Sequence, residues 1–204
     1  MLNDNYRVAF IGTHGTGKTY VSNQLKKHFK VYSEAPLNEF MGKNCYLAEA
    51  QLHDDYISIN SQLSSETEYC VSDRFGILSV LLYSEAFNRM GWLSDEDNLK
   101  IVNLVNDGDV DWVLPKRLLY INEDIVVLKS RILQRGRKGL NEEDGLYLGT
   151  VNELYKDYFG GFDVLPELDG EIKKSFKRIP HTKIKSTDSL ESIIEYIVWI
   201  FIVH

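Results

Sequence analysis

Short apolar runs alternate with longer amphipathic stretches along the chain. The runs are rich in β-forming residues and predict strands over 6–11, 30–33, 69–72, 117–121 and 182–185. The stretches between them repeat apolar residues at helical spacing and predict helices over 19–29, 44–63, 77–90, 124–134 and 142–158. Caps predict two further helices, one after Ser94 and a last one after Thr187 or Ser189. Such an alternation favours an α/β fold with helices on both faces of a parallel sheet.

Two segments stand apart from this alternation. The stretch 160–170 contains glycine, proline and several acids, so it is predicted to be a loop or an insertion. The last helix ends in the apolar run 199–203 and carries more apolar surface than one core face needs. It is therefore either wholly buried or paired with a second subunit, which makes a homodimer one expectation.

The composition is that of an ordinary folded protein. The 204 residues are expected to form a single domain, 1–204, and 44% apolar with 26% charged residues argue against wholesale disorder. A net charge of −7 argues against a protein that binds nucleic acid over its whole surface. Nucleic-acid binding would then require a local basic face. Cys45 and Cys70 are too few for a disulfide scaffold and lack metal-ligand spacing, which fits a reduced compartment.

Nothing in the apolar pattern indicates a membrane protein. The longest apolar run, 196–203, is too short to cross a bilayer as a helix, and the first residues lack the layout of a signal peptide. We therefore expect a cytoplasmic protein without a membrane partner.

The most specific signal is a phosphate-binding loop. The pattern G-x-x-x-x-G-K-[ST] is matched by Gly12, Thr13, His14, Gly15, Thr16, Gly17, Lys18 and Thr19. A predicted strand precedes this loop and a predicted helix follows it, so its amide groups and the helix N-terminus can surround an anion. We expect this loop to bind ATP, with Lys18 at the β- and γ-phosphates and the Thr19 hydroxyl on Mg²⁺.

An acid follows the third predicted strand. Asp73 lies where a ligand of Mg²⁺-bound water is expected if that strand neighbours the first one. The same residue opens a D-x-x-G sequence ending at Gly76, which GTPases also contain. The guanine motif [NT]-K-x-D occurs nowhere in the chain, so a kinase is favoured over a regulatory GTPase.

Several segments together resemble the thymidylate kinase and deoxynucleoside kinase lineage of P-loop kinases. Some small phage-type P-loop kinases look similar at the same positions. Glu34-Ala35-Pro36 resembles the Glu-Pro element of this family, and Asp73-Arg74-Phe75 resembles its Asp/Glu-Arg-x element. The segment 115–121 resembles its Pro-x-Leu-x-Tyr-Leu strand. Two departures concern the acceptor side: Ala35 separates Glu34 from Pro36, and Phe75 replaces serine or tyrosine.

The basic loop after residue 130 resembles the arginine lid of the same family. It contains Arg131, Arg135 and Arg137, and acids and the pair Tyr147-Leu148 follow it. The resemblance implies a P-loop nucleoside triphosphate hydrolase fold of the nucleotide kinase type, with ATP and Mg²⁺ as cofactors and a lid at about 131–145. It also implies that the lid arginines neutralise the transferred phosphoryl group, for which their planar forks suit them.

The acceptor hydroxyl needs a group that takes its proton. Glu34 is the leading candidate because it follows the second strand at the carboxyl edge of the predicted sheet. By resemblance, Arg74 contacts the acceptor side, near the 5′ oxygen or an acceptor phosphate. Gln51 and Gln62 are possible readers of the base, although an exposed helix glutamine is the simpler interpretation of each.

Charge bears on the kind of acceptor. Between Pro36 and Asp73 the chain holds Lys43 and no arginine, but six acids, which favours a neutral nucleoside over a nucleotide. The 11 cations in the segments 129–138 and 173–185 could follow a nucleic-acid backbone if they share a face. The function expected is an ATP-dependent phosphotransferase acting on a nucleoside or nucleotide. The alternatives are a kinase of a hydroxyl on DNA and a nucleotide-binding regulatory ATPase.

Overall fold

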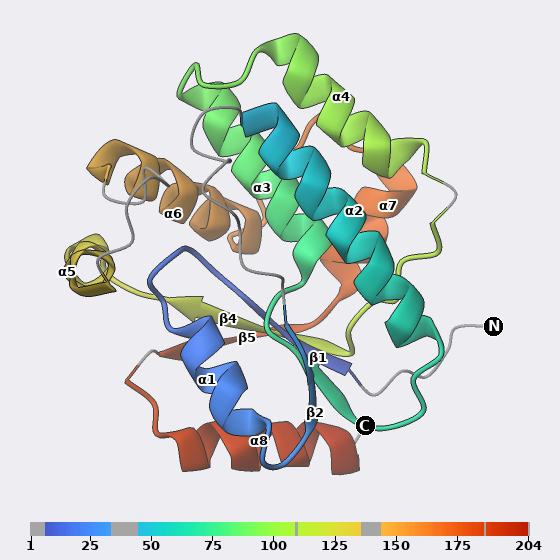
Figure 1. Ribbon diagram of the computed structural model, residues 1–204, viewed down its shortest axis with the longest axis vertical. Helices are drawn as coiled ribbons and strands as arrows, with labels where there is room; N and C mark the ends of the chain where they lie inside the picture. The colour runs from blue at the N-terminus through green and yellow to red at the C-terminus, as the bar shows by residue number, and fades with distance from the viewer. Residues whose placement is uncertain (1–6, 34–44, 109, 136–143, 186, 204) are drawn as a thin grey trace.

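A parallel sheet of five strands runs through the molecule, in the order β2-β3-β1-β4-β5 (Figure 1). The computed structural model describes residues 7–33, 45–108, 110–135, 144–185 and 187–203. The strands are β1 (Arg7–Ile11), β2 (Lys30–Tyr32), β3 (Cys70–Ser72), β4 (Arg117–Asn122) and β5 (His181–Lys185). Each one overlaps a strand predicted from the sequence, and every neighbouring pair is parallel, so the predicted fold class is confirmed.

The described residues form eight helices, of which the sequence predicted seven. They are α1 (Lys18–Leu25), α2 (Cys45–Ser64), α3 (Gly76–Arg89), α4 (Asp95–Asn106), α5 (Ile125–Arg135), α6 (Gly145–Phe159), α7 (Gly170–Arg178) and α8 (Leu190–Val203). The predicted cap is present, because the Ser94 hydroxyl accepts a hydrogen bond from the amide of Asp97 at 3.1 Å. The helix that the sequence did not predict is α7, which contains the basic residues between 173 and 178.

Local chemistry explains why α7 forms. The Asp169 side chain accepts from the amides of Glu171 and Ile172, which caps the helix at its first turn. On its inner side Phe176 is buried, with its ring 5.2 Å from that of Phe75 in an edge-on arrangement. The apolar contact is limited to one side of a short and charged helix, so hydrophobic periodicity alone did not reveal it.

Alternate residues of the central strands face opposite layers of helices. Val8 and Phe10 of β1 pack with the layer of α1 and α8, whereas Ala9 and Ile11 pack with the layer of α3 and α6. In Figure 1 the two layers are seen on opposite sides of the sheet. The prediction that helices cover both faces is therefore confirmed.

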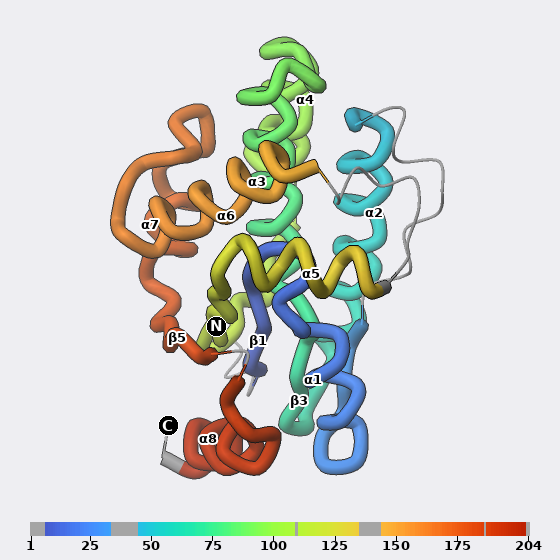
Figure 2. Tube along the Cα trace, turned by 90° about the vertical axis from the view of Figure 1, so that its left-hand side faces the viewer, coloured from blue at the N-terminus to red at the C-terminus, as the bar shows by residue number. Residues whose placement is uncertain are grey.

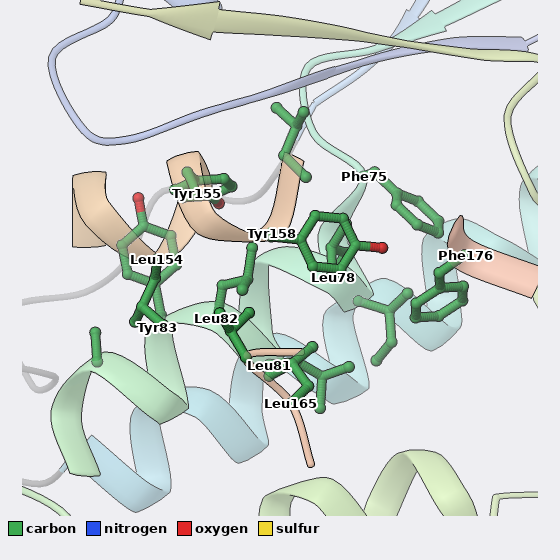
Figure 3. Packing of buried hydrophobic residues seen from close by; sticks show 14 of the residues in the cluster. Phe75, Leu78, Leu81, Leu82, Tyr83, Leu154, Tyr155, Tyr158, Leu165 and Phe176 are labelled. Atoms are coloured by element: carbon green, nitrogen blue, oxygen red, sulfur yellow. The ribbon is translucent and has the colours of Figure 1, made fainter. Parts of the chain in front are cut away.

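The larger core joins α3 to α6. Leu78, Leu82 and Tyr83 of α3 are buried against Leu154 and Tyr155 of α6 (Figure 3). The rings of Tyr83 and Tyr155 lie 6.2 Å apart at 75°. Both helices also contact the phosphate loop, so this packing fixes the surroundings of the loop.

Helix α8 is only partly covered. Ile193, Ile197 and Ile200 are buried against the sheet, whereas Trp199 is 46% and Ile202 is 77% exposed. Whole burial of this helix, one of the two expectations, is thus wrong, and pairing with a second subunit stays a prediction. No helix in the described ranges is both long and apolar enough to cross a lipid bilayer.

Candidate functional site

The phosphate loop, residues 12–17, follows the carboxyl end of β1. At this strand the order of the strands along the sheet reverses. From β1 the chain crosses to β2 beyond β3, whereas from β4 it crosses to β5 on the other side. Helix α1, which follows the loop, and α5, which follows β4, run in different directions from this end of the sheet (Figure 2). In open α/β sheets, ligands bind at such a point, outside the carboxyl ends of the strands.

Glycines give the loop its path. Gly12, Gly15 and Gly17 have φ angles of 144°, 78° and 93°, which side chains with a Cβ rarely adopt. A Cβ on Gly12 would collide with the carbonyl oxygen of Ile121 in β4. The loop thus approaches the neighbouring strand closely. Successive amides of a glycine turn of this kind can form an anion-binding nest.

Lys18 folds over the loop it follows. Its ammonium donates to the carbonyl of Gly12 at 2.5 Å, to that of Thr13 at 2.8 Å and to the hydroxyl of Thr16 at 3.3 Å. The side chain is buried, with 5% of its surface exposed. A lysine ammonium is a compact charge with three rotatable donors, so it can contact phosphate oxygens from this position.

Four other loop residues make contacts within the loop or with the helices α5 and α6. The Thr13 hydroxyl lies 3.3 Å from Oδ1 of the buried Asn152 in α6, and the Thr16 hydroxyl donates to the Thr13 carbonyl at 2.9 Å. His14 Nε2 lies 3.0 Å from the hydroxyl of Tyr147, also in α6. The backbone of Gly15 lies against α5. The loop is therefore fixed to the two helices that border the residues predicted to form the lid.

Thr19 and Asp73 are the predicted metal-side residues. Thr19 is exposed in the first turn of α1, and Asp73 is 4% exposed, directly after β3. Because β3 pairs with β1, the expected neighbourhood of the two strand ends is confirmed. Among the described residues no group of three His, Cys, Asp or Glu side chains could hold a metal ion. One hydroxyl and one carboxylate nevertheless suit Mg²⁺ at a nucleotide, since this ion keeps several waters and binds phosphates.

Backbone hydrogen bonds fix the segment that contains Asp73 and Arg74. The Asp73 amide donates to the carbonyl of Tyr32 at 2.9 Å, and the Phe75 amide donates to that of Phe10 at 3.0 Å. Asp73 is thereby tied to the last residue of β2, two positions before Glu34. Arg74 is half-buried at the start of α3. Glu34 itself lies outside the described residues.

Of the predicted lid arginines, the structure describes one side chain. Arg131 lies on α5, where its guanidinium is 3.8 Å from the carboxylate of Glu123. Arg135 ends the same helix, and Arg137 lies outside the described residues. The structure therefore does not test the predicted roles of Arg135 and Arg137.

A cavity of about 440 Å³ opens beside the phosphate loop. Its walls come from the loop, from α5 and from the segment between β5 and α8; they include Gly15, Thr16, Gly17, Arg131, Gln134, Lys185 and Asp188. This volume lies within the range of small-molecule pockets, and the polar groups at its rim can fix the orientation of a ligand. The cavity is continuous with the loop that would bind the phosphates, so it suits the base and sugar of a nucleotide.

Gln51 and Gln62, the possible readers of the base, agree with the simpler interpretation of each as an exposed helix glutamine. Gln51 and Gln62 are exposed on α2, so neither faces the core of the site, whereas Glu49 and His53 of the same helix are buried. The helices α5 and α7 lie at opposite sides of the molecule in Figure 1, so these two helices do not form one basic face. Lys185, in contrast, lines the same cavity as Arg131.

Two residues of the site were missed altogether. Tyr147 was noted only as part of the lid resemblance, and Asn152 was not considered. Both contact the phosphate loop from α6, 133 and 139 positions further along the chain. The sequence gives one signal for Asn152: a polar residue in the middle of the apolar face of a predicted helix.

The fold is shared with deoxynucleoside kinases of known structure. Deoxyadenosine kinase from M. mycoides with the products dCMP and dCDP superposes with a TM-score of 0.74 at 17% identity, covering 94% of this chain and 96% of that one. The same enzyme with bound dATP or dCTP gives a TM-score of 0.69 at 18% identity over the same shares of both chains. Neither a protein-family model nor a curated protein matches the chain.

Proposed function

We propose that the chain is an ATP-dependent kinase that transfers the γ-phosphoryl group of ATP to a deoxynucleoside or a deoxynucleoside monophosphate. The observation that carries the proposal is the glycine loop with Lys18 at the switch point of the sheet, flanked by Asp73 and by a cavity of about 440 Å³. The likeness to deoxyadenosine kinases over 94% of the chain supports the same reaction class.

The donor site follows from the loop. The loop amides and Lys18 bind the phosphates, and the adjacent cavity takes the base and sugar of ATP. Thr19 and Asp73 would hold Mg²⁺, which supplies charge neutralisation at the phosphates when it is bound. Arg131, Arg135 and Arg137 belong to the proposed machinery as cations for the transferred group.

The acceptor site follows from the segments after β2 and β3. Glu34 takes the proton of the acceptor hydroxyl, and Arg74 orients the acceptor near it. The acidic stretch between Pro36 and Asp73, with the buried Glu49 on α2, favours a neutral nucleoside over a monophosphate. The named products dCMP and dCDP of the similar M. mycoides enzyme support a deoxynucleoside or its monophosphate as the acceptor class.

The test is a transfer assay with labelled ATP and a panel of deoxynucleosides and their monophosphates. We expect a labelled nucleotide product, and Lys18→Ala should reduce its rate by about 100-fold or more while the fold stays intact. Lys26→Ala, an exposed lysine after the end of α1, is the matched control and should keep the wild-type rate. Release of free phosphate alone, with every acceptor, would contradict the proposal and favour a regulatory ATPase.

Glu34→Gln separates the acceptor role from donor binding. This variant should lose most of the transfer rate but bind ATP as the wild type does, because the amide cannot take a proton. A Gln variant that turns over like the wild type would exclude Glu34 as the base.

A further inference from the structure

A second small cavity lies between α2, the start of α3 and the segment before β4, away from the loop-side cavity. It holds about 20 Å³, which is room for one water-sized particle or a single halide ion and not for a phosphate. Its lining includes Arg7, Asn60, Arg74, Gly76, Ile77 and Trp112. Of these residues, Arg74 is also assigned a role in the proposed kinase reaction, whereas Arg7, Asn60 and Trp112 are not.

Arg7 brings a buried positive charge to this cavity. The residue is 4% exposed, and burial lowers the pKa of its guanidinium to about 10, so it stays charged at neutral pH. Nη2 donates to the carbonyl of Val113 at 2.5 Å, and the guanidinium lies 5.8 Å from the centre of the Phe75 ring. Neither partner carries a formal charge. No ion pair joins Arg7 to a carboxylate in the described part of the chain, so none of the described carboxylates balances its charge directly.

Two N–H donors belong to residues of this lining and lack a described partner. Nε of Arg7 and Nε1 of Trp112 are both buried, and neither has a hydrogen-bond partner among the described residues. The Asn60 side chain is already bonded at both ends, because Oδ1 accepts from the amide of Val113 at 2.7 Å and Nδ2 donates to the carbonyl of Asp111 at 2.9 Å. Two buried N–H groups thus line one cavity, and each lost hydrogen bond costs about 1–3 kcal/mol.

Helix α3 adds positive potential at the same place. It begins at Gly76 without a side-chain cap, and Gly76 and Ile77 of its first turn line the cavity. First-turn amides have no carbonyl to bond within the helix, and the helix dipole favours negative charge beside them. A guanidinium, an indole N–H and a helix N-terminus therefore converge on a volume of one small particle.

We propose that this cavity is a binding site for a small monovalent anion of chloride size. A water molecule would satisfy the donors but would leave the charge of Arg7 unbalanced, whereas a halide does both. A ligand that binds only the folded state raises the free energy of unfolding with its concentration until the site is full. Chloride binding at this site would therefore stabilise the fold, independently of any kinase activity.

The experiment measures the melting temperature of the full chain against chloride or bromide, with gluconate keeping the ionic strength constant. The wild type should gain stability in a saturable way with both halides and not with gluconate. Arg7→Met should abolish this gain, whereas Arg117→Met, another arginine at the start of a strand, should keep it. Trp112→Phe removes only the indole N–H and should raise the half-saturating chloride concentration several-fold, which keeps the test valid if Arg7→Met does not fold.

A crystal soaked in bromide gives an independent readout, since an anomalous peak is expected between Arg7 and Trp112. An equal response to halide and gluconate, an unchanged halide response in both cavity variants, or an ordered water in place of the bromide would each overturn the proposal.

Discussion

The imidazole Nε2 of His14 in the phosphate loop lies 3.0 Å from the hydroxyl of Tyr147 in α6. The His14 ring also packs against Tyr83 of α3, with the ring centres 4.7 Å apart. Tyr147 in turn stacks on Phe87 and Trp92, at 5.6 Å and 5.5 Å. The phosphate loop is thereby joined to α3 and α6 through an aromatic cluster rather than through its backbone alone.

Tyr147→Phe removes the hydroxyl and keeps the stacked ring. We expect kcat to fall several-fold, because the loop loses a contact that positions it, whereas the free energy of unfolding should drop by only about 0.5–1.5 kcal/mol. Steady-state kinetics and urea unfolding measure the two effects. Tyr69→Phe, on an exposed ring stacked on Phe201, is the control and should leave kcat unchanged. An unaltered kcat in Tyr147→Phe would mean that the contact is only structural.

This contact also shows where prediction from the sequence ends. The positions marked x in the loop pattern tolerate many side chains, so the pattern assigns no particular contact to His14. Its partner lies 133 residues further along the chain, and no local pattern reports such a pairing. Strands, most helices and the loop follow from local chemistry, whereas contacts between helices depend on the tertiary packing of α3 and α6.

Helix α2 illustrates a second limit. The prediction of a helix over 44–63 is confirmed within one residue at each end, yet the candidate base readers Gln51 and Gln62 face solvent. The inward face instead carries Glu49, His53 and Asn60. These polar residues lie among the buried apolar residues Leu52, Tyr56 and Leu63, so periodicity located the helix but did not show that polar side chains are buried with them.

Gly12→Ala should disable the phosphate loop. The residue has a φ of 144°, and a Cβ would run into the Ile121 carbonyl, so we expect a loss of about 1–3 kcal/mol in stability together with loss of ATP binding. Gly91→Ala is the matched control, because Gly91 also has a positive φ, 71°, but no atom lies near its Cβ position. It should cost about 1 kcal/mol and leave ATP binding intact. Calorimetric titration with ATP and thermal unfolding separate the two outcomes.

Asp73→Asn tests the proposed metal side. Replacing the carboxylate by an amide should raise the Mg²⁺ concentration needed for half-maximal activity and lower kcat by about 10–100-fold. ATP binding without Mg²⁺ should stay unchanged, since the amide group keeps the shape of the side chain. Asp107→Asn, on an exposed acid after α4, is the control. An unshifted Mg²⁺ dependence in Asp73→Asn would exclude this carboxylate from the metal site.

The contacts of Glu66 make the stability of β2, the strand that precedes Glu34, dependent on pH. Its Oε2 accepts from the hydroxyl of Tyr32, the last residue of β2, at 2.5 Å and pairs with the ammonium of Lys30. The hydrogen bond from Lys30, followed by the one from Tyr32, lowers the pKa of this carboxyl from 4.5 to about 2. A carboxyl with a lowered folded-state pKa stabilises the fold above its unfolded pKa, and this stabilisation is lost as the pH falls.

The difference in the free energy of unfolding between wild type and Glu66→Gln should therefore be constant above about pH 5.5. It should shrink between pH 4.5 and about 2, where the unfolded and then the folded carboxyl take up their protons. Urea unfolding at a series of pH values measures this difference, and Glu68→Gln, an exposed acid two residues away, controls for the loss of one charge. A difference that does not change with pH would show that Glu66 acts on β2 through packing, without a contribution from its charge.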